Sequence, residues 1–148
     1  MTTKPIALAC DHAGYPLKEE LKKHFDETGV SYIDYGTNSY DSVNYPDFAH
    51  ALCTAIGEGT HDLGILVCGT GIGMSMAANK HRGIRAAVLS DTFSARMTRM
   101  HNDANVLCLG ARVVGAGLAI DIADLFLSTE YEGGRHQKRV DMLNALDD

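Results

Sequence analysis

The chain has 148 residues, a length that predicts one domain spanning residues 1–148. Apolar residues make up 45% and charged residues 22%, which excludes a disordered chain and is typical of a globular protein with a full core. The net charge of −6 argues against a nucleic-acid-binding groove.

Neither a signal peptide nor a membrane span is expected. The opening segment, Met-Thr-Thr-Lys-Pro, lacks the apolar stretch of a signal peptide. The longest uncharged run, residues 63–79, contains closely spaced glycines that would disrupt a membrane helix. The cysteines lie in apolar surroundings without a CxxC pair and are expected to be buried free thiols: Cys10, Cys53, Cys68 and Cys108. We therefore predict a cytoplasmic protein.

Short apolar runs alternate with helical patterns along the whole chain. In chain order, the predicted segments are a strand at 6–10, a helix from Pro16 to a stop at Gly29, a strand at 30–35, a loop at 39–44, a helix from Pro46 to 57–59, a strand at 65–67, a helix at 74–80, a strand at 84–89, a helix capped by Ser90 or Asp91 that runs to Met100, a strand at 106–109, a helix at 113–127 and a last helix at 135–146.

This alternation predicts an α/β fold, a Rossmann-like doubly wound five-stranded parallel sheet. Ligands of such sheets bind beyond the carboxyl ends of the strands, where the strand order reverses. The segments expected at these strand ends are Asp11-His12, Gly36-Thr37, 68–71, Ser90-Asp91 and 110–112. Most of the side chains that could bind a ligand or take part in catalysis should therefore lie along one edge of the sheet.

A glycine turn follows the third predicted strand. Cys68 ends that strand, and Gly69, Gly71 and Gly73 come at alternate positions before a helix. The spacing matches neither the dinucleotide fingerprint nor a Walker loop. Backbone N–H groups of such a turn, with the positive end of the helix dipole, can hold a phosphate or an oxyanion. The alternative is a tight strand-to-helix turn that serves packing alone.

Three side chains near these segments could carry proton transfer or nucleophilic chemistry. Cys68 could be a nucleophile, a general base beside the glycine turn, or a plain buried cysteine. His101, at the end of a predicted helix, suits a general acid, although a surface histidine in a turn is the alternative. His12 follows the first strand beside Asp11, which could instead be only a helix cap. Neither histidine belongs to a set with metal-ligand spacing, so the sequence does not indicate a metal.

Basic residues stand out in this acidic chain. Arg135 and Arg139 are four residues apart and share one helix face, where they could clamp a phosphate or simply face solvent. Arg112 follows the fifth strand and is a third candidate. The glycines at 133 and 134 suggest that the last helix is an arm that reaches a partner chain.

Seven motifs, in register from the first strand to the last helix, resemble the B type of ribose-5-phosphate isomerase, whose wider family includes allose- and galactose-6-phosphate isomerases. The motifs are Cys10-Asp-His-Ala-Gly14, Asn44-Tyr-Pro46, Gly64-Ile-Leu-Val-Cys-Gly-Thr-Gly-Ile-Gly73, Ala77-Ala-Asn-Lys80, His101-Asn-Asp-Ala-Asn-Val106, Gly110-Ala-Arg-Val-Val114 and Glu132-Gly-Gly-Arg-His-Gln-Lys-Arg139.

The resemblance implies interconversion of ribose 5-phosphate and ribulose 5-phosphate through an enediolate, without metal or cofactor. Cys68 would be the base, and His101 would open the furanose ring. The residues implied to contact the substrate are Asp11, His12, Tyr45, Gly69, Thr70, Gly71, Ile72, Gly73 and Asn102, with Arg112, Arg135 and Arg139 as phosphate ligands. Thr70 belongs to the cradle for the enediolate oxygens.

Family members are homodimers, some of which pair again to tetramers, with each site built from both chains. One branch uses a glutamate just after the last glycine of the turn, but Met74 occupies that position here, which places the chain in the cysteine branch. Alternatives to the pentose activity are an isomerase of six-carbon sugar phosphates, a phosphate-ligand or nucleotide-binding module without turnover, and a cysteine hydrolase.

Overall fold

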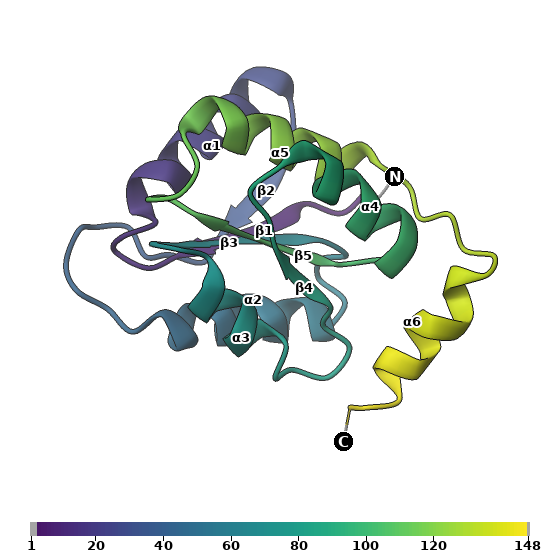
Figure 1. Cartoon of the computed structure of the whole chain (residues 1–148). Helices are drawn as coiled ribbons and strands as arrows, with labels where there is room; N and C mark the ends of the chain where they lie inside the picture. The colour runs from purple at the N-terminus through teal and green to yellow at the C-terminus, as the bar shows by residue number, and fades with distance from the viewer. Residues whose placement is uncertain (1–2, 148) are drawn as a thin grey trace.

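A parallel sheet forms the centre of the computed structural model, which describes residues 3–147 of the chain. Its strands are β1 (Ile6–Cys10), β2 (Tyr32–Asp34), β3 (Gly64–Cys68), β4 (Ala86–Val88) and β5 (Val106–Gly110). They lie in the order β2-β1-β3-β5-β4, and every neighbouring pair is parallel. The predicted doubly wound sheet of five strands is thus confirmed (Figure 1).

Helices cover both faces of this sheet. They are α1 (Tyr15–Thr28), α2 (Tyr45–Gly57), α3 (Ile72–Ala78), α4 (Thr92–Asn102), α5 (Ala116–Ser128) and α6 (His136–Asn144). Helices α1, α4 and α5 lie on one face, and α2 and α3 lie on the other (Figure 1). No helix within residues 3–147 is both long and apolar enough to span a bilayer.

The core consists of two apolar layers, one on each side of the sheet. Strands β1, β3 and β5 are buried along their whole length, as expected for central strands covered by helices on both faces. Because side chains of a strand alternate between faces, Leu8 and Cys10 pack with α1, α4 and α5, whereas Ala7 and Ala9 pack with α2 and α3.

The strand order reverses between β1 and β3. The chain moves outward from β1 to β2 and then returns to the other side of β1 to form β3, beyond which β5 and β4 lie. A crevice therefore opens at the carboxyl ends of β1 and β3, because their following segments leave in opposite directions. These segments begin with Asp11 and Gly69, at the edge where the sequence places the functional groups.

Several predicted boundaries move by a few residues. Helix α5 begins at Ala116 instead of 113, because the N–H groups of Val113 and Val114 both donate to the carbonyl of Gly110 at 3.0 Å and hold a separate turn. Helix α3 begins at Ile72, two residues earlier than predicted, so the glycine turn leads directly into its first turn. Helix α4 continues to Asn102, which places His101 in its last turn.

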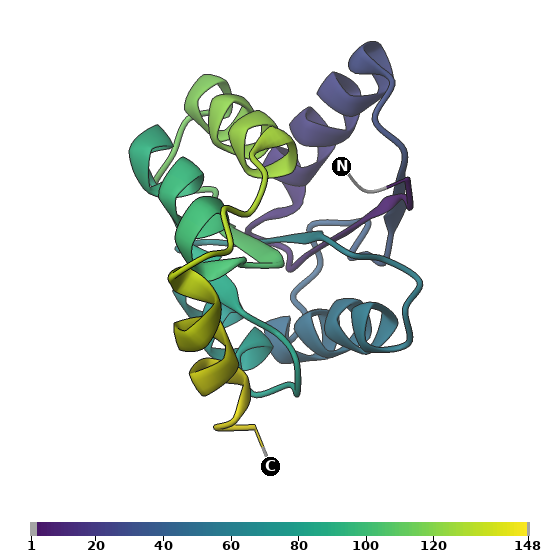
Figure 2. The same cartoon turned by 90° about the vertical axis from the view of Figure 1, so that its right-hand side faces the viewer.

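The last segment leaves the body of the fold near the amino ends of the strands. After Gly133 and Gly134, helix α6 lies outside the sandwich and beside the end of α4 (Figures 1 and 2). Arg85 Nη1 donates to Asn144 Oδ1 at 2.9 Å, and the N–H of Gly83 donates to Asp147 Oδ2 at 2.7 Å. These polar contacts attach the arm, defined here as residues 130–147, to the turn before β4.

Candidate active site

Cys68 is the last residue of β3, and the glycine turn wraps around its sulfur. The side chain is 5% exposed, and the N–H of Gly71 donates to Cys68 Sγ at 3.1 Å. Gly71 has φ +79°, and a Cβ there would lie 2.9 Å from the carbonyl carbon of Leu109, so only glycine fits this turn. A backbone donor aimed at the sulfur suits a negative charge on that atom.

The other cysteines have a different environment. All are buried free thiols, as predicted. Burial raises the pKa of Cys10 to about 11 and that of Cys53 to about 12, and it raises the pKa of Cys108 well above its usual value. These three thiols are inert packing groups, and Cys68 is the cysteine that faces an open cleft.

The cleft beside Cys68 has a volume of about 440 Å³ and lies at the reversal of strand order. Its lining residues come from the ends of β1, β3 and β5 and from the starts of α2 and α3. They are Asp11, His12, Ala13, Tyr45, Cys68, Gly69, Thr70, Ile72, Gly73, Met76 and Arg112. The structure thus gathers most of the predicted site residues into one cleft, and Gly71 adjoins it through its bond to Cys68.

Two residues after β1 have distinct polar partners. The carboxylate of Asp11 accepts the N–H of Gly14 at 2.9 Å, so it stabilises the start of α1 while it also lines the cleft. His12 Nδ1 accepts the N–H of Val43 at 3.1 Å. A neutral His12 ring therefore carries its proton on Nε2, which leaves that nitrogen as a hydrogen-bond donor.

Tyr45 and Arg112 flank the glycine turn. A Cβ at Gly73 would lie 2.7 Å from Tyr45 Cζ, so the absence of a side chain at this position lets the phenol ring lie directly on the turn. The N–H of Arg112 donates to the carbonyl of Gly69 at 3.0 Å, and Arg112 Nη1 lies 3.5 Å from the position of a Cβ on Gly69. The cleft therefore has a guanidinium cation beside the glycine turn.

Thr70 contributes a hydroxyl to the same turn. Its Oγ1 accepts the N–H of Ile72 at 3.2 Å, which leaves the hydroxyl hydrogen free to donate. Met76, one helical turn after Ile72, and Ala13 also line the cleft, although neither was predicted from the sequence. The i, i+4 spacing of Ile72 and Met76 was the available signal for Met76.

The remaining predicted residues lie elsewhere in the single chain. His101 and Asn102 are in the last turn of α4, at the edge where the strands begin, and Arg135 and Arg139 are exposed on the arm. None of the four lines the cleft at Cys68. Within one chain the structure therefore divides the predicted residues between two opposite edges of the sheet.

His101 has partners that sequence spacing did not reveal. Its ring stacks on that of His136, with centroids 4.2 Å apart and an interplanar angle of 17°. His101 Nε2 lies 3.7 Å from Glu132 Oε2, and His136 Nε2 lies 4.0 Å from the same oxygen. Among the described residues these three form a group whose ligand atoms could hold a metal ion. Only the four-residue spacing of Glu132 and His136 was visible in the sequence.

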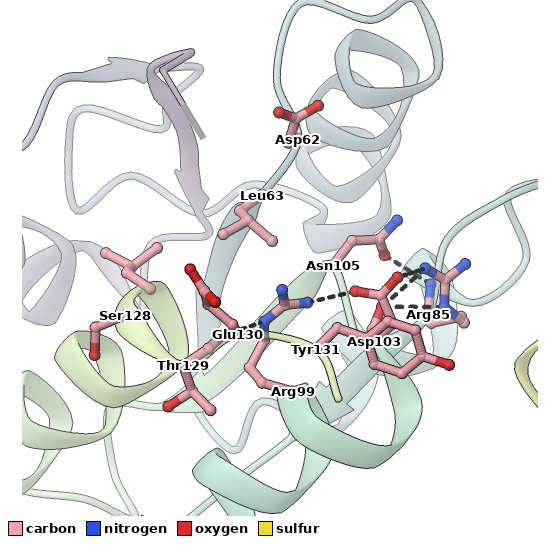
Figure 3. Close-up of a pocket in the computed structure, with 11 residues that line it drawn as sticks. Asp62, Leu63, Arg85, Arg99, Asp103, Asn105, Ser128, Thr129, Glu130 and Tyr131 are labelled. Carbon is pink, nitrogen blue, oxygen red and sulfur yellow. Dashed lines mark hydrogen bonds and ion pairs between the residues drawn. The ribbon is translucent and has the colours of Figure 1, made fainter. Parts of the chain in front are cut away.

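A second cavity, of about 480 Å³, lies at the amino edge of the sheet (Figure 3). Its two arginines are already paired: Arg99 Nη1 donates to Asp103 Oδ1 at 3.0 Å, and Arg85 Nη2 donates to the carbonyl of Asp103 at 2.8 Å. These bonds hold the turn after α4, where Asp103 has φ +48°. The cavity has no cysteine or histidine in its lining, and we assign its arginines a structural role.

Comparisons with known proteins agree with this geometry. The sequence model of the Ribose/Galactose Isomerase family matches residues 6–143. Ribose-5-phosphate isomerase B of Escherichia coli is 51% identical over 144 residues, which are 97% of either chain. The crystal structure of a ribose 5-phosphate isomerase from Thermotoga maritima superposes with a TM-score of 0.95 at 46% identity, over 98% of this chain and all of that one. A structure of the Mycoplasma genitalium isomerase B with bound ribulose 5-phosphate has a TM-score of 0.91 at 40% identity, over 98% of this chain and 97% of that one.

Proposed function

The chain belongs to the ribose/galactose isomerase family, and from this premise we propose that it interconverts D-ribose 5-phosphate and D-ribulose 5-phosphate. The observation that carries the proposal is the position of Cys68, whose sulfur faces an open cleft and receives the N–H of Gly71 at 3.1 Å. Relatives of high identity that are named for the five-carbon substrate support the pentose activity over a six-carbon one. We place this single isomerase domain in the cytoplasm, in the pentose phosphate pathway.

Proton transfer is assigned to Cys68. The thiolate removes the hydrogen on C2 of the open-chain aldose, and the electrons of that C–H bond form the C1–C2 double bond of an enediolate. Negative charge develops on O1, where the Thr70 hydroxyl and the backbone N–H groups of the glycine turn stabilise it. The thiol then returns the proton to C1, and the ketose is complete once O1 has gained a proton and O2 has lost one.

Ring opening precedes this step and is assigned to His101. A protonated imidazole gives its hydrogen to the ring oxygen as the bond between that oxygen and C1 breaks, and the hydroxyl on C1 releases its proton to water as the C1 carbonyl forms. Asn102 lies beside His101 to hold the sugar hydroxyls. Arg112, Arg135 and Arg139 bind the phosphate, because guanidinium groups match phosphate oxygens in charge and geometry. His12, as a donor through Nε2, contacts the substrate beside Asp11.

We further propose a homodimer in which each site uses Cys68 of one chain and His101 of the other. The support is that these two residues lie at opposite edges of the sheet within one chain. The arm also exposes large apolar side chains that a partner would cover, namely Met142, Leu143 and Leu146. After Gly133 and Gly134, α6 lies outside the sandwich and beside α4, where a partner chain could pack against it (Figure 2).

The test of the proposed function is turnover of ribose 5-phosphate by the purified chain, compared with Cys68→Ala and Cys53→Ala. We expect Cys68→Ala to reduce turnover to background while sugar-phosphate binding survives. Cys53→Ala is the matched control, because it removes a buried thiol that does not line the cleft, and it should stay active. Full turnover by Cys68→Ala would remove the cysteine from the base role. Higher kcat/KM with allose 6-phosphate would instead assign a six-carbon substrate.

A further inference from the structure

Three metal-ligating side chains converge where the end of α4 meets the arm. The nitrogen atoms of His101 and His136 lie 3.7 and 4.0 Å from one carboxylate oxygen of Glu132, and all three ligand atoms lie within 4.8 Å of one another. We propose that His101, Glu132 and His136 form a binding site for a divalent transition-metal ion of the Zn²⁺ class, and that an ion bound there inhibits the enzyme.

The geometry is close to that of a three-ligand metal site. Bonds of about 2.0–2.2 Å in a tetrahedral arrangement place ligand atoms about 3.4 Å apart. The observed separations from Glu132 exceed this by a few tenths of an ångström, which small side-chain rotations can close. The two imidazole rings are stacked, and the Nε2 atom of each lies near the same Glu132 oxygen. Three protein ligands leave a fourth position open for water.

His136 gives a second, independent reason to expect a ligand. The residue is 8% exposed, and its Nε2 is a buried atom without a hydrogen-bond partner among the described residues. A buried polar nitrogen of this kind costs free energy unless something binds it. This unpartnered Nε2 atom lies 4.0 Å from Glu132 Oε2 and so offers a ligand position beside that carboxylate.

The surrounding charges restrict the class of ion. Glu132 supplies one negative charge, but Arg135 and Arg139 lie close enough to act on the charge of His136 and oppose any cation. Pure electrostatic attraction is therefore weak, which disfavours Mg²⁺ and Ca²⁺. Two imidazole ligands favour Zn²⁺, Co²⁺, Ni²⁺ and Cu²⁺, because these ions form stronger bonds to nitrogen.

The inhibitory part of the inference rests on the proposed function. If His101 supplies the proton that opens the sugar ring, an ion on its Nε2 removes that proton and occupies the position that the ring oxygen must approach. The ion acts here as an inhibitor and supplies no step of the reaction. Chelation should therefore restore activity completely.

The binding site is tested by titrating the full-length protein with Co²⁺ and following its visible absorption. We expect one Co²⁺ per chain, a spectrum without the near-ultraviolet band of a cobalt–thiolate bond, and no competition from excess Mg²⁺. Glu132→Gln, at an exposed position that tolerates substitution, should weaken binding about tenfold or more. Glu130→Gln makes the same charge change two residues away and should bind as the wild type does.

Equal Co²⁺ binding by Glu132→Gln and the wild type would overturn the proposed metal site. A Co²⁺ absorption that is lost only in Cys68→Ala would overturn it as well.

The inhibitory role is tested by measuring inhibition of turnover by Zn²⁺, with the activity of each variant normalised to its own turnover without metal. We expect the half-inhibitory Zn²⁺ concentration to rise about tenfold or more in Glu132→Gln and to stay unchanged in Glu130→Gln. Tight Co²⁺ binding without inhibition of turnover would refute the inhibitory role and leave the metal site standing. If the wild type shows no turnover of ribose 5-phosphate even without metal, the proposed function is refuted. The Co²⁺ titration would in that case still show whether the metal site exists.

Discussion

The backbone N–H of Gly71 donates to Sγ of Cys68 at 3.1 Å, across a turn in which the positive φ of Gly71 and the nearby carbonyl carbon of Leu109 leave no space for a side chain. The position of the reactive sulfur and the conformation of the turn therefore depend on each other. This relationship leads to the first prediction.

Gly71→Ala should lower kcat about 100-fold, because the new Cβ displaces the turn and withdraws backbone donors from the sulfur and from the developing oxyanion. Steady-state kinetics with ribose 5-phosphate measures this effect. Gly59→Ala is the matched control: Gly59 has φ +86°, but a Cβ added there would meet no atom within 4 Å, so it introduces similar backbone strain far from Cys68. Equal losses of activity in both variants would assign the effect to strain alone.

Activity should return when two inactive variants share a dimer. Mixing unfolded Cys68→Ala and His101→Asn chains and refolding them produces mixed dimers in about half of the molecules, and each mixed dimer has one intact site of two. About a quarter of the wild-type activity should therefore return. Refolding Cys68→Ala with Cys68→Ser is the control and should restore nothing. No recovery in the first mixture would show that Cys68 and His101 act within one chain.

Arg139→Ala should raise KM for the sugar phosphate about 10-fold to 100-fold with little change in kcat, because a lost charge-assisted hydrogen bond to phosphate weakens substrate and transition state alike. Lys138→Ala removes a neighbouring exposed cation and should leave KM within about twofold, since a solvated surface charge contributes little. Similar increases in both variants would indicate general electrostatic attraction instead of a specific phosphate ligand.

The stability of the fold should fall in acid partly through Asp34. Burial opposes ionisation of this carboxylate, but hydrogen bonds from Lys18 at 2.6 Å and Lys22 at 2.9 Å outweigh it and lower its pKa. A lowered folded-state pKa stabilises the protein above the unfolded value of about 3.9, and this stabilisation is lost as the pH falls through the folded value. Asp34→Asn should therefore be less stable than the wild type at pH 7.

Urea unfolding at pH 7 and in the range below pH 4 measures this difference. The gap in unfolding free energy between the wild type and Asp34→Asn should narrow as the pH falls. Asp26→Asn, at an exposed carboxylate that accepts from Tyr32, is the control and should show a smaller gap at pH 7. A gap that stays constant over the acidic range would show that ionisation of Asp34 is not the cause.

Much of the fold followed from the sequence, because buried parallel strands are short continuous apolar runs and the helices between them have regular apolar spacing. The glycine turn after Cys68 could also be predicted, because glycines at alternate positions after a strand are typical of a tight strand-to-helix turn. The predicted start of α5 was three residues too early, because Val113 and Val114 extend the apolar pattern while their N–H groups bond Gly110. The spacing of apolar residues carries no information about such a backbone hydrogen bond.

The division of the site was harder to predict. The residues that follow the strands all lie at the carboxyl edge of the sheet. His101 is instead at the end of α4, which runs antiparallel to the strands, so it lies at the amino edge. The grouping of His101 with Glu132 and His136 depends on how the arm folds back beside α4, where the N–H of Glu132 donates to the carbonyl of Met100 at 3.1 Å. Residues so far apart in the chain give no spacing signal for this contact.

The placement of Cys68 and His101 at opposite edges has a consequence for dilute solutions. If two chains must meet to complete each reaction centre, a separated chain has no catalytic capacity, however well it is folded. Below the dissociation constant of the pair, the measured rate should then increase with the square of the protein concentration, so that dilution lowers the rate per chain as well as the total rate.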